Sequence, residues 1–168
     1  IMSTPFVAIV MGSDSDLPVM EASFDVLKKF GIPFEVRITS AHRTPAAAKA
    51  FIEDADKRGC AAFIAAAGMA AHLAGAVSAT TVKPVIGVPM NASLDGLDAL
   101  LSTVQMPAGI PVATVAIGKA GAKNAAYLAA QIIAVSDPAL AEALREERAD
   151  NARAIESKNA ELQAKLKG

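Results

Sequence analysis

The chain has 168 residues, of which 53% are hydrophobic, and its formal net charge is −1. Its 38 alanines account for much of the hydrophobic fraction and leave about 30% of the chain to the other apolar types, which is usual for a globular core. The length predicts one domain, and the lack of a basic run argues against a nucleic-acid surface, which needs clustered lysine and arginine.

Two charge-free stretches, 59–82 and 99–118, have about the 20-residue length of a membrane span. The first contains His72 and a Ser/Thr cluster, and the second is interrupted by Pro107 and Pro111. We therefore predict buried strands joined to small-residue loops and helices, with no membrane contact.

The cysteine count and the first residues indicate a compartment. Cys60 is the single cysteine, so no intrachain disulfide is possible and a reducing environment fits. Residues 1–5 lack the charged start of a signal peptide, and Ile1 before Met2 is expected to be a processing remnant. We expect a cytoplasmic protein.

Short apolar runs alternate with segments of helical spacing along most of the chain. The runs predict strands over 6–11, 34–39, 61–66, 84–88 and 112–117. The other segments predict helices over 17–30, 45–58, 94–105 and 122–135, with one more entered near residue 75. This alternation predicts right-handed crossovers and a parallel sheet covered by helices on both faces.

Two helix starts carry candidate caps. Thr44 and Pro45 predict a hydroxyl N-cap followed by proline at the first helical position. Asp16 is either the N-cap of the helix over 17–30 or an acceptor for ligand hydroxyls such as those of a ribose.

The C-terminal segment, 137–167, differs from the rest because it is charged and has only a thin apolar stripe. The stripe consists of Leu140, Leu144, Ile155, Leu162 and Leu166. Such a stripe cannot build a core, so we predict a single domain, 1–168, in which an α/β core over about 5–135 is followed by a helical arm that packs on a neighbouring subunit. A solvated terminal helix is the alternative.

Both histidines of the chain, His42 and His72, follow predicted strands. In an open parallel sheet, ligands bind outside the carboxyl ends of the strands, so this placement indicates a functional role. His42 also precedes Arg43, whose guanidinium suits phosphate or carboxylate groups.

Two further loops lie at the same predicted edge. In the loop 12–16, Gly12 permits close backbone approach and Ser13 offers a hydroxyl, which suits a phosphate cradle or a plain turn equally. The small residues of 65–75 permit close helix packing or close ligand approach, and His72 favours a ligand site.

Several enzyme classes lack their motifs in this chain. There is no dinucleotide or P-loop glycine pattern, no nucleophile elbow and no metal-ligand spacing of His and Cys. What remains is an anion-binding α/β domain with one or two imidazoles for proton transfer.

Five motifs follow one another in register between residues 6 and 135. They are Gly-Ser-Asp-Ser-Asp at 12–16, Ser-Ala-His-Arg-Thr-Pro at 40–45, Ala-Gly-Met-Ala-Ala-His-Leu at 67–73, Pro-Val-Ile-Gly-Val-Pro at 84–89 and Gln-Met-Pro-Ala-Gly-Ile-Pro-Val-Ala-Thr at 105–114. Together they resemble the 5-(carboxyamino)imidazole ribonucleotide mutase family of purine biosynthesis, in its class I form.

The resemblance implies a flavodoxin-like three-layer αβα sandwich with a five-stranded parallel sheet, assembled as a cytoplasmic homo-octamer. It implies an isomerase that moves a carboxylate from the exocyclic nitrogen of the ribonucleotide to carbon 4 of its imidazole, by decarboxylation and recarboxylation. No metal and no organic cofactor are implied. The expected functional partner is the ATP-dependent synthetase that makes the substrate.

The resemblance also assigns roles to residues. His42 is expected to be the general acid and base. Ser13, Asp16 and Arg43 are expected to bind the phosphate and ribose of the substrate. The remaining residues expected to line the pocket are Ser40, Gly68 and His72.

Three other functions stay open at this point. A related class carboxylates aminoimidazole ribonucleotide directly and carries Ser-Asn where this chain has Ala71-His72, which favours the mutase. A non-catalytic module binding a phosphorylated ligand is possible, and a flavin-binding flavodoxin is weakened by the absence of tryptophan and the single Tyr127. Many relatives have proline where this chain has Ala74, a difference that leaves the loop freer.

Overall fold

The computed structural model describes residues 5–168. The expectations about a signal peptide and a processing remnant concern Ile1 to Thr4, which lie outside the described residues.

Five parallel strands form one sheet in the order β2-β1-β3-β4-β5, which is the flavodoxin-like order and confirms the predicted fold class. The strands are β1 (Phe6–Met11), β2 (Phe34–Ile38), β3 (Cys60–Ala67), β4 (Val85–Pro89) and β5 (Ala113–Thr114). The strand order reverses between β1 and β3, so the loops that follow these two strands lead to helices on opposite faces of the sheet.

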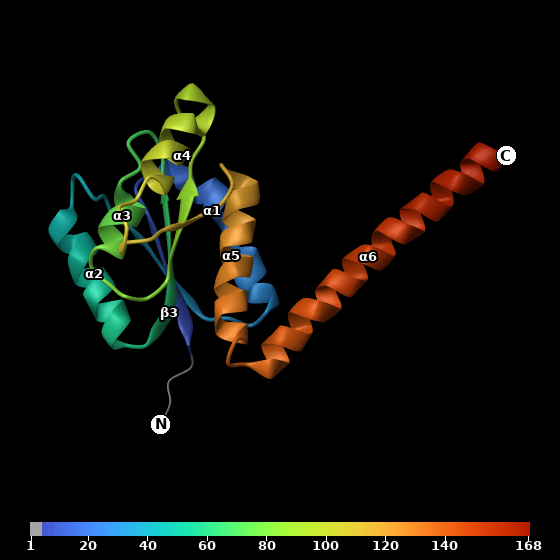
Figure 1. Ribbon diagram of the computed structural model, residues 1–168, viewed down its shortest axis with the longest axis horizontal. Helices are drawn as coiled ribbons and strands as arrows, with labels where there is room; N and C mark the ends of the chain where they lie inside the picture. The colour runs from blue at the N-terminus through green and yellow to red at the C-terminus, as the bar shows by residue number, and fades with distance from the viewer. Residues whose placement is uncertain (1–4) are drawn as a thin grey trace. The chain divides into compact units, whose positions relative to one another are not determined.

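Helices cover both faces of the sheet, with α2 and α3 on one side and α1 and α5 on the other (Figure 1). The helices are α1 (Leu17–Lys29), α2 (Pro45–Lys57), α3 (Leu73–Ser78), α4 (Leu97–Val104), α5 (Lys119–Ala134) and α6 (Pro138–Lys167). Short 3₁₀ turns, η1 (Asp14–Asp16) and η2 (Leu94–Gly96), precede α1 and α4. No helix among residues 5–168 combines the length and the apolar character that crossing a membrane requires.

The fifth strand is shorter than predicted. Only Ala113 and Thr114 pair with β4, although Val115 and Gly118 still donate backbone hydrogen bonds to Gly87 and Pro89. The segment therefore follows the edge of β4 without forming a continuous ladder, and its apolar run was insufficient to extend the strand to residue 117.

The predicted hydroxyl cap of α2 is wrong in its hydrogen bonding. Thr44 occupies the N-cap position, but its hydroxyl does not cap the helix. It instead accepts a hydrogen bond from the backbone N–H of Ser40 at 2.9 Å, because the loop before the helix folds back on itself. Asp16 likewise occupies the N-cap position of α1 without a side-chain capping bond, so its carboxylate remains available at the cavity described below.

The core depends on small side chains. Five alanines of α5 that face the sheet side are fully buried: Ala122, Ala125, Ala126, Ala129 and Ala130. The buried Ser23 hydroxyl of α1 donates to the Ala122 carbonyl at 2.5 Å and so joins the two helices of this face. Gly87 of β4 lies so close to α4 that an added Cβ would be 2.4 Å from Thr103 Cγ2.

Burial raises the pKa of the Cys60 thiol, which keeps this side chain protonated within the core.

Residues 134–168 form a separate compact unit that consists mainly of α6. The Asp137 carboxylate accepts a hydrogen bond from the Leu140 backbone N–H at 3.1 Å and so caps the helix. Ion pairs within the helix join Arg145 to Glu142 and Arg153 to Asp150. Its apolar side chains Ile155, Leu162 and Leu166 are 68%, 51% and 72% exposed within this chain.

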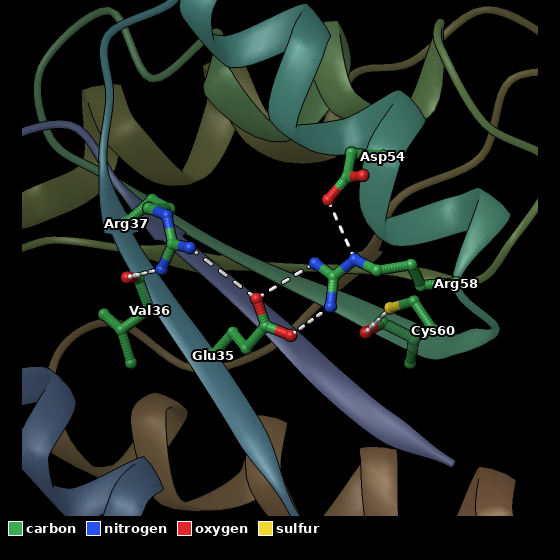
Figure 2. Close-up of polar contacts among 7 residues, drawn as sticks. Glu35, Val36, Arg37, Asp54, Arg58 and Cys60 are labelled. Carbon is green, nitrogen blue, oxygen red and sulfur yellow. Dashed lines mark hydrogen bonds and ion pairs between the residues drawn. The ribbon is translucent and has the colours of Figure 1, made fainter. Parts of the chain in front are cut away.

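A charged cluster ties the edge strand β2 to the end of α2. The Arg58 guanidinium donates to both carboxylate oxygens of Glu35, at 2.5 and 3.0 Å, and to Asp54 at 2.8 Å (Figure 2). Arg37 lies on the other side of Glu35 at 3.7 Å. The hydrogen bonds from Arg58 lower the pKa of Glu35 below its ordinary value of 4.5.

We predict that Glu35→Gln lowers the melting temperature at pH 7 by roughly 1–3 °C. Because the folded-state pKa of Glu35 is lowered, its contribution is complete above the unfolded pKa and is lost as the pH falls through the folded value. The difference between wild type and variant should therefore disappear in strong acid. Thermal melts from pH 7 to pH 3 check this, with Glu53→Gln, which removes the exposed 3.9 Å pair to Lys49, as the control. An unchanged difference across that range would refute it.

Candidate active site

A cavity of about 620 Å³ lies at the carboxyl ends of the strands, above the point where strand order reverses. The loops after β1, β2, β3 and β4 all contribute to its walls, and Gly118 before α5 completes them. Parallel pairing brings these loops together, because every strand ends at the same edge of the sheet.

All seven residues singled out from the sequence line this one cavity. They are Ser13, Asp16, Ser40, His42, Arg43, Gly68 and His72. Their assembly in one place is a finding of the structure, and their individual roles remain predictions.

The two histidines form a pair. His42 Nε2 lies 2.8 Å from His72 Nδ1, and the two rings meet edge to face with centroids 4.9 Å apart and planes at 82°. A single proton occupies this contact when both rings are neutral, so one nitrogen donates and the other accepts. The two imidazoles are therefore coupled, since the tautomer of one determines the tautomer of the other.

The loop that carries His42 is held by its own hydroxyls. Ser40 Oγ accepts hydrogen bonds from the backbone N–H groups of His42 at 3.2 Å and Arg43 at 3.0 Å. Thr44 Oγ1 lies 3.1 Å from the Thr39 hydroxyl. These bonds fix the backbone on both sides of the imidazole, while the Arg43 guanidinium makes no hydrogen bond or ion pair within residues 5–168. The loop thus presents a rigid imidazole beside a cation that is available to a ligand.

The loop after β1 places hydroxyls and a carboxylate at the cavity. Ser13 Oγ lies 2.8 Å from Ser15 Oγ and accepts a hydrogen bond from the Ser15 backbone N–H at 3.2 Å. Burial raises the pKa of Asp16 above its ordinary value of 3.8, an effect that a backbone hydrogen bond with Ser13 partly offsets and nearby Asp14 reinforces. A partly desolvated carboxylate in a cavity wall is suited to receive hydroxyl donors from a ligand.

The loop after β3 approaches its neighbours closely. A Cβ added at Gly68 would lie 3.3 Å from Ala92 Cβ and 3.4 Å from Met90 Cβ. Met69 adopts a φ of +55°, which is uncommon for a residue with a side chain and marks a constrained backbone. This constraint lies three residues before His72.

The sequence reasoning missed the contribution of the loop after β4. Met90, Asn91 and Ala92 line the cavity, as does Ser15 in the first loop. Asn91 is a polar residue that follows a buried strand, the same signal that identified His42 and His72. Applying that rule to the fourth strand would have found it.

A larger hollow of about 780 Å³ lies at the opposite edge, around the amino ends of β4 and β5. No imidazole lines it, and its ionisable groups are Asp56 and Lys83. The Asp56 carboxylate already accepts a hydrogen bond from the Thr81 hydroxyl at 2.6 Å. The cavity with the histidine pair is therefore the better candidate for chemistry.

Comparison with known proteins identifies the family to which the chain is similar. Residues 6–154 match the model of the family described as AIR carboxylase. The chain is 52% identical over 160 residues to a Pyrococcus horikoshii protein named N5-carboxyaminoimidazole ribonucleotide mutase, covering 95% of this chain and 89% of that protein. It is 58% identical over 137 residues to a Saccharomyces cerevisiae protein named phosphoribosylaminoimidazole carboxylase, covering 81% of this chain and 24% of that protein.

A solved structure shares the fold. The crystal structure of Treponema denticola PurE superposes with a TM-score of 0.85 at 33% sequence identity, covering 94% of this chain and 98% of that chain. Strand order and sequence thus lead to the same family.

We predict that Asp16→Asn raises the melting temperature at pH 7 by about 1–3 °C, because it removes a carboxylate that loses hydration on folding. The folded-state pKa of Asp16 is raised, so its unfavourable contribution grows as the pH rises from 3.8 through the folded value and is absent in stronger acid. The gain should therefore vanish below pH 3.8. Melts across this range check it against Asp25→Asn, which alters an exposed carboxylate of α1; a gain that persists in acid would contradict the explanation.

Proposed function

The chain belongs to the AIR carboxylase family, and we propose that its histidine-lined cavity is the active site of an N5-carboxyaminoimidazole ribonucleotide mutase, an isomerase of purine biosynthesis. The observation that carries this proposal is the 2.8 Å contact between His42 and His72, in a cavity that Ser13, Ser40 and Arg43 also line. Relatives that carry the mutase name match nearly their whole length to this chain.

The reaction moves one carboxylate and conserves protons. The bond between the exocyclic nitrogen and its carboxylate breaks to give carbon dioxide, and the nitrogen gains a proton. Carbon 4 of the imidazole then attacks the retained carbon dioxide, and the proton on carbon 4 is removed. One proton is gained and one is lost, so a single imidazole can serve both steps.

His42 is the residue we assign to both proton transfers. Its Nε2 faces His72, and Ser40 holds its backbone, so the ring is presented in one orientation. A positioned acid or base contributes roughly 10²–10⁴-fold to the rate of each step it serves. His72 Nδ1 accepts a hydrogen bond from His42 Nε2 or donates one to it. It thereby helps to determine which ring nitrogen of His42 carries the proton.

The loop 12–16 and Arg43 suit the phosphate and ribose of the substrate. Arg43 supplies a guanidinium fork for phosphate oxygens, and Ser13 supplies a hydroxyl donor beside it in the same cavity. Asp16 accepts hydrogen bonds from ribose hydroxyls, which replace the water that its carboxylate has lost. Gly68 permits the loop after β3 to lie against the bound ligand.

The proposal is tested with the purified protein and N5-carboxyaminoimidazole ribonucleotide. We predict formation of the 4-carboxy isomer, and we predict that His42→Asn lowers kcat by at least about 10²-fold while leaving affinity for ribose 5-phosphate within a few-fold. Stopped-flow absorbance and calorimetric titration measure these two quantities.

Three results would count against it. Turnover of aminoimidazole ribonucleotide with dilute bicarbonate, in preference to the carbamate, would identify a direct carboxylase instead. Full activity of His42→Asn would remove this imidazole from the chemistry. Binding of ribose 5-phosphate without any turnover would indicate a non-catalytic module.

We also propose a homo-octamer. The side chains along one face of η2 and α4 are apolar and exposed within this chain: Leu94 by 75%, Leu97 by 52%, Leu101 by 47% and Val104 by 45%. Contact with another subunit would remove this face from water. We further propose that α6 packs on a neighbouring subunit through its sparse apolar stripe, which includes Leu162.

We predict a native mass about eight times the 17.1 kDa of one chain. Leu97→Lys and Leu162→Lys should each lower that mass, because a charge cannot be buried without a partner, whereas Glu53→Lys on the exposed side of α2 should not. Light scattering coupled to size exclusion measures this. A monomeric wild type, or octamers from both leucine variants, would overturn the assembly.

The chemistry of the substrate implies its supplier. A carbamate on the exocyclic nitrogen must be made by a carboxylating reaction, and we propose an ATP-dependent synthetase as the functional partner. We place both enzymes in the cytoplasm, a reducing compartment in which a free, buried Cys60 stays reduced.

A further inference from the structure

We propose that Ser102, a residue of α4, is a positioning residue for the histidine pair. It is absent from the motifs that identified the site and lies in a different element from either histidine. The kinetic part of its test rests on the proposed function, while the spectroscopic part does not.

The Ser102 hydroxyl joins α4 to the loop after β3. Its Oγ accepts a hydrogen bond from the Ala71 backbone N–H at 2.9 Å. The same Oγ lies 2.8 Å from the Asp98 carbonyl, 3.2 Å from the Ala99 carbonyl and 3.2 Å from the Met69 carbonyl. A hydroxyl has one proton, so Ser102 donates to one of these carbonyls at a time. In each case a lone pair of its oxygen can still accept the hydrogen bond from the Ala71 N–H.

The loop needs an external support at this point. Met69 has a left-handed backbone at φ +55°, a conformation that persists only where surrounding contacts determine it. Ala71 is 1% exposed, so its backbone N–H depends on the Ser102 hydroxyl as its partner. The helix that follows, α3, has only six residues and cannot fix the loop through its own stability. The bond from Ala71 to Ser102 is therefore the contact that holds the loop in place from the α4 side.

The position of Ala71 determines where the two histidines meet. His72 is the next residue, and its backbone N–H donates to the Ala70 carbonyl at 2.9 Å, which makes the turn tight. The Nδ1 atom of His72 then meets His42 Nε2 at 2.8 Å, near the optimum for a hydrogen bond. Both histidines and Ser102 also line a second cavity, of about 590 Å³, on the α4 side of the pair. A shift of Ala71 toward this space would lengthen the contact between the imidazoles.

Removal of the hydroxyl should thus disturb the imidazoles without touching the loop 12–16 or Arg43, to which we assign the phosphate and ribose. We expect Ser102→Ala to lower kcat about 10-fold while KM stays within about 2-fold. Misplacement of a catalytic imidazole slows the chemical step more than it weakens substrate binding. The pH profile of kcat should differ from that of wild type, because the contact between the two imidazoles is disturbed. Ser102→Thr retains the acceptor oxygen and should restore most of the rate.

The chain provides a matched control one residue away. The Thr103 hydroxyl donates to the Ala99 carbonyl at 2.7 Å, a bond within α4 like that of Ser102 to Asp98, and it has no described contact with the loop 69–71. Thr103→Val removes this hydroxyl with little change of shape. It should leave kcat, the pH profile and the imidazole spectra close to wild type.

A measurement without substrate separates this proposal from the proposed function. The chain has two histidines, so ¹⁵N NMR of histidine-labelled protein shows only two imidazoles. We expect complementary tautomers in wild type, Ser102→Thr and Thr103→Val, and averaged tautomers in Ser102→Ala. The proposal is overturned if Ser102→Ala gives the wild-type spectrum, or if its kcat matches that of Thr103→Val. A wild type with paired imidazoles and no mutase turnover would refute the proposed function, and averaged tautomers in Ser102→Ala would still support the positioning role.

Discussion

The close approach of backbone to backbone is the constraint on which the rest of this structure depends. A Cβ at Gly121 would lie 1.6 Å from the Ala116 carbonyl oxygen, so no side chain fits between α5 and the segment before it. The buried alanines of α5 and the contact of Gly87 with α4 extend the same rule to both faces of the sheet. The alanines that account for much of the hydrophobic content of the chain therefore allow helices to pack closely on a parallel sheet.

Close packing has a direct consequence for the site. Because α4 lies near β4, Ser102 can reach the loop after β3, and that loop can bring His72 to His42. Neither histidine has a partner within its own loop that would place the ring so specifically. The chemistry proposed here, a proton given to nitrogen and another taken from carbon 4, requires one imidazole held in one tautomer. The paired imidazoles meet that requirement.

Much of this architecture could be predicted from the sequence, since strands buried on both faces have continuous apolar runs. The segment 112–117 was the exception, because edge pairing there depends on backbone hydrogen bonds that composition does not reveal. The role of the Thr44 hydroxyl was wrong for a related reason, as its partner Ser40 is determined by the path of the loop. Residue types placed His42 and His72 at one edge, but their hydrogen bond and its support by Ser102 are relations between elements far apart in the chain. Such relations need coordinates.

The central claim is that one cavity breaks and remakes the carboxylate bond without releasing carbon dioxide to solution. Its most direct test uses N5-carboxyaminoimidazole ribonucleotide labelled with ¹³C in the carboxylate, turned over in excess unlabelled bicarbonate and followed by NMR. We predict that the label appears in the carboxylate at carbon 4 of the product faster than it equilibrates with the bicarbonate. Product that carries only unlabelled carboxylate from the first turnovers would contradict the account.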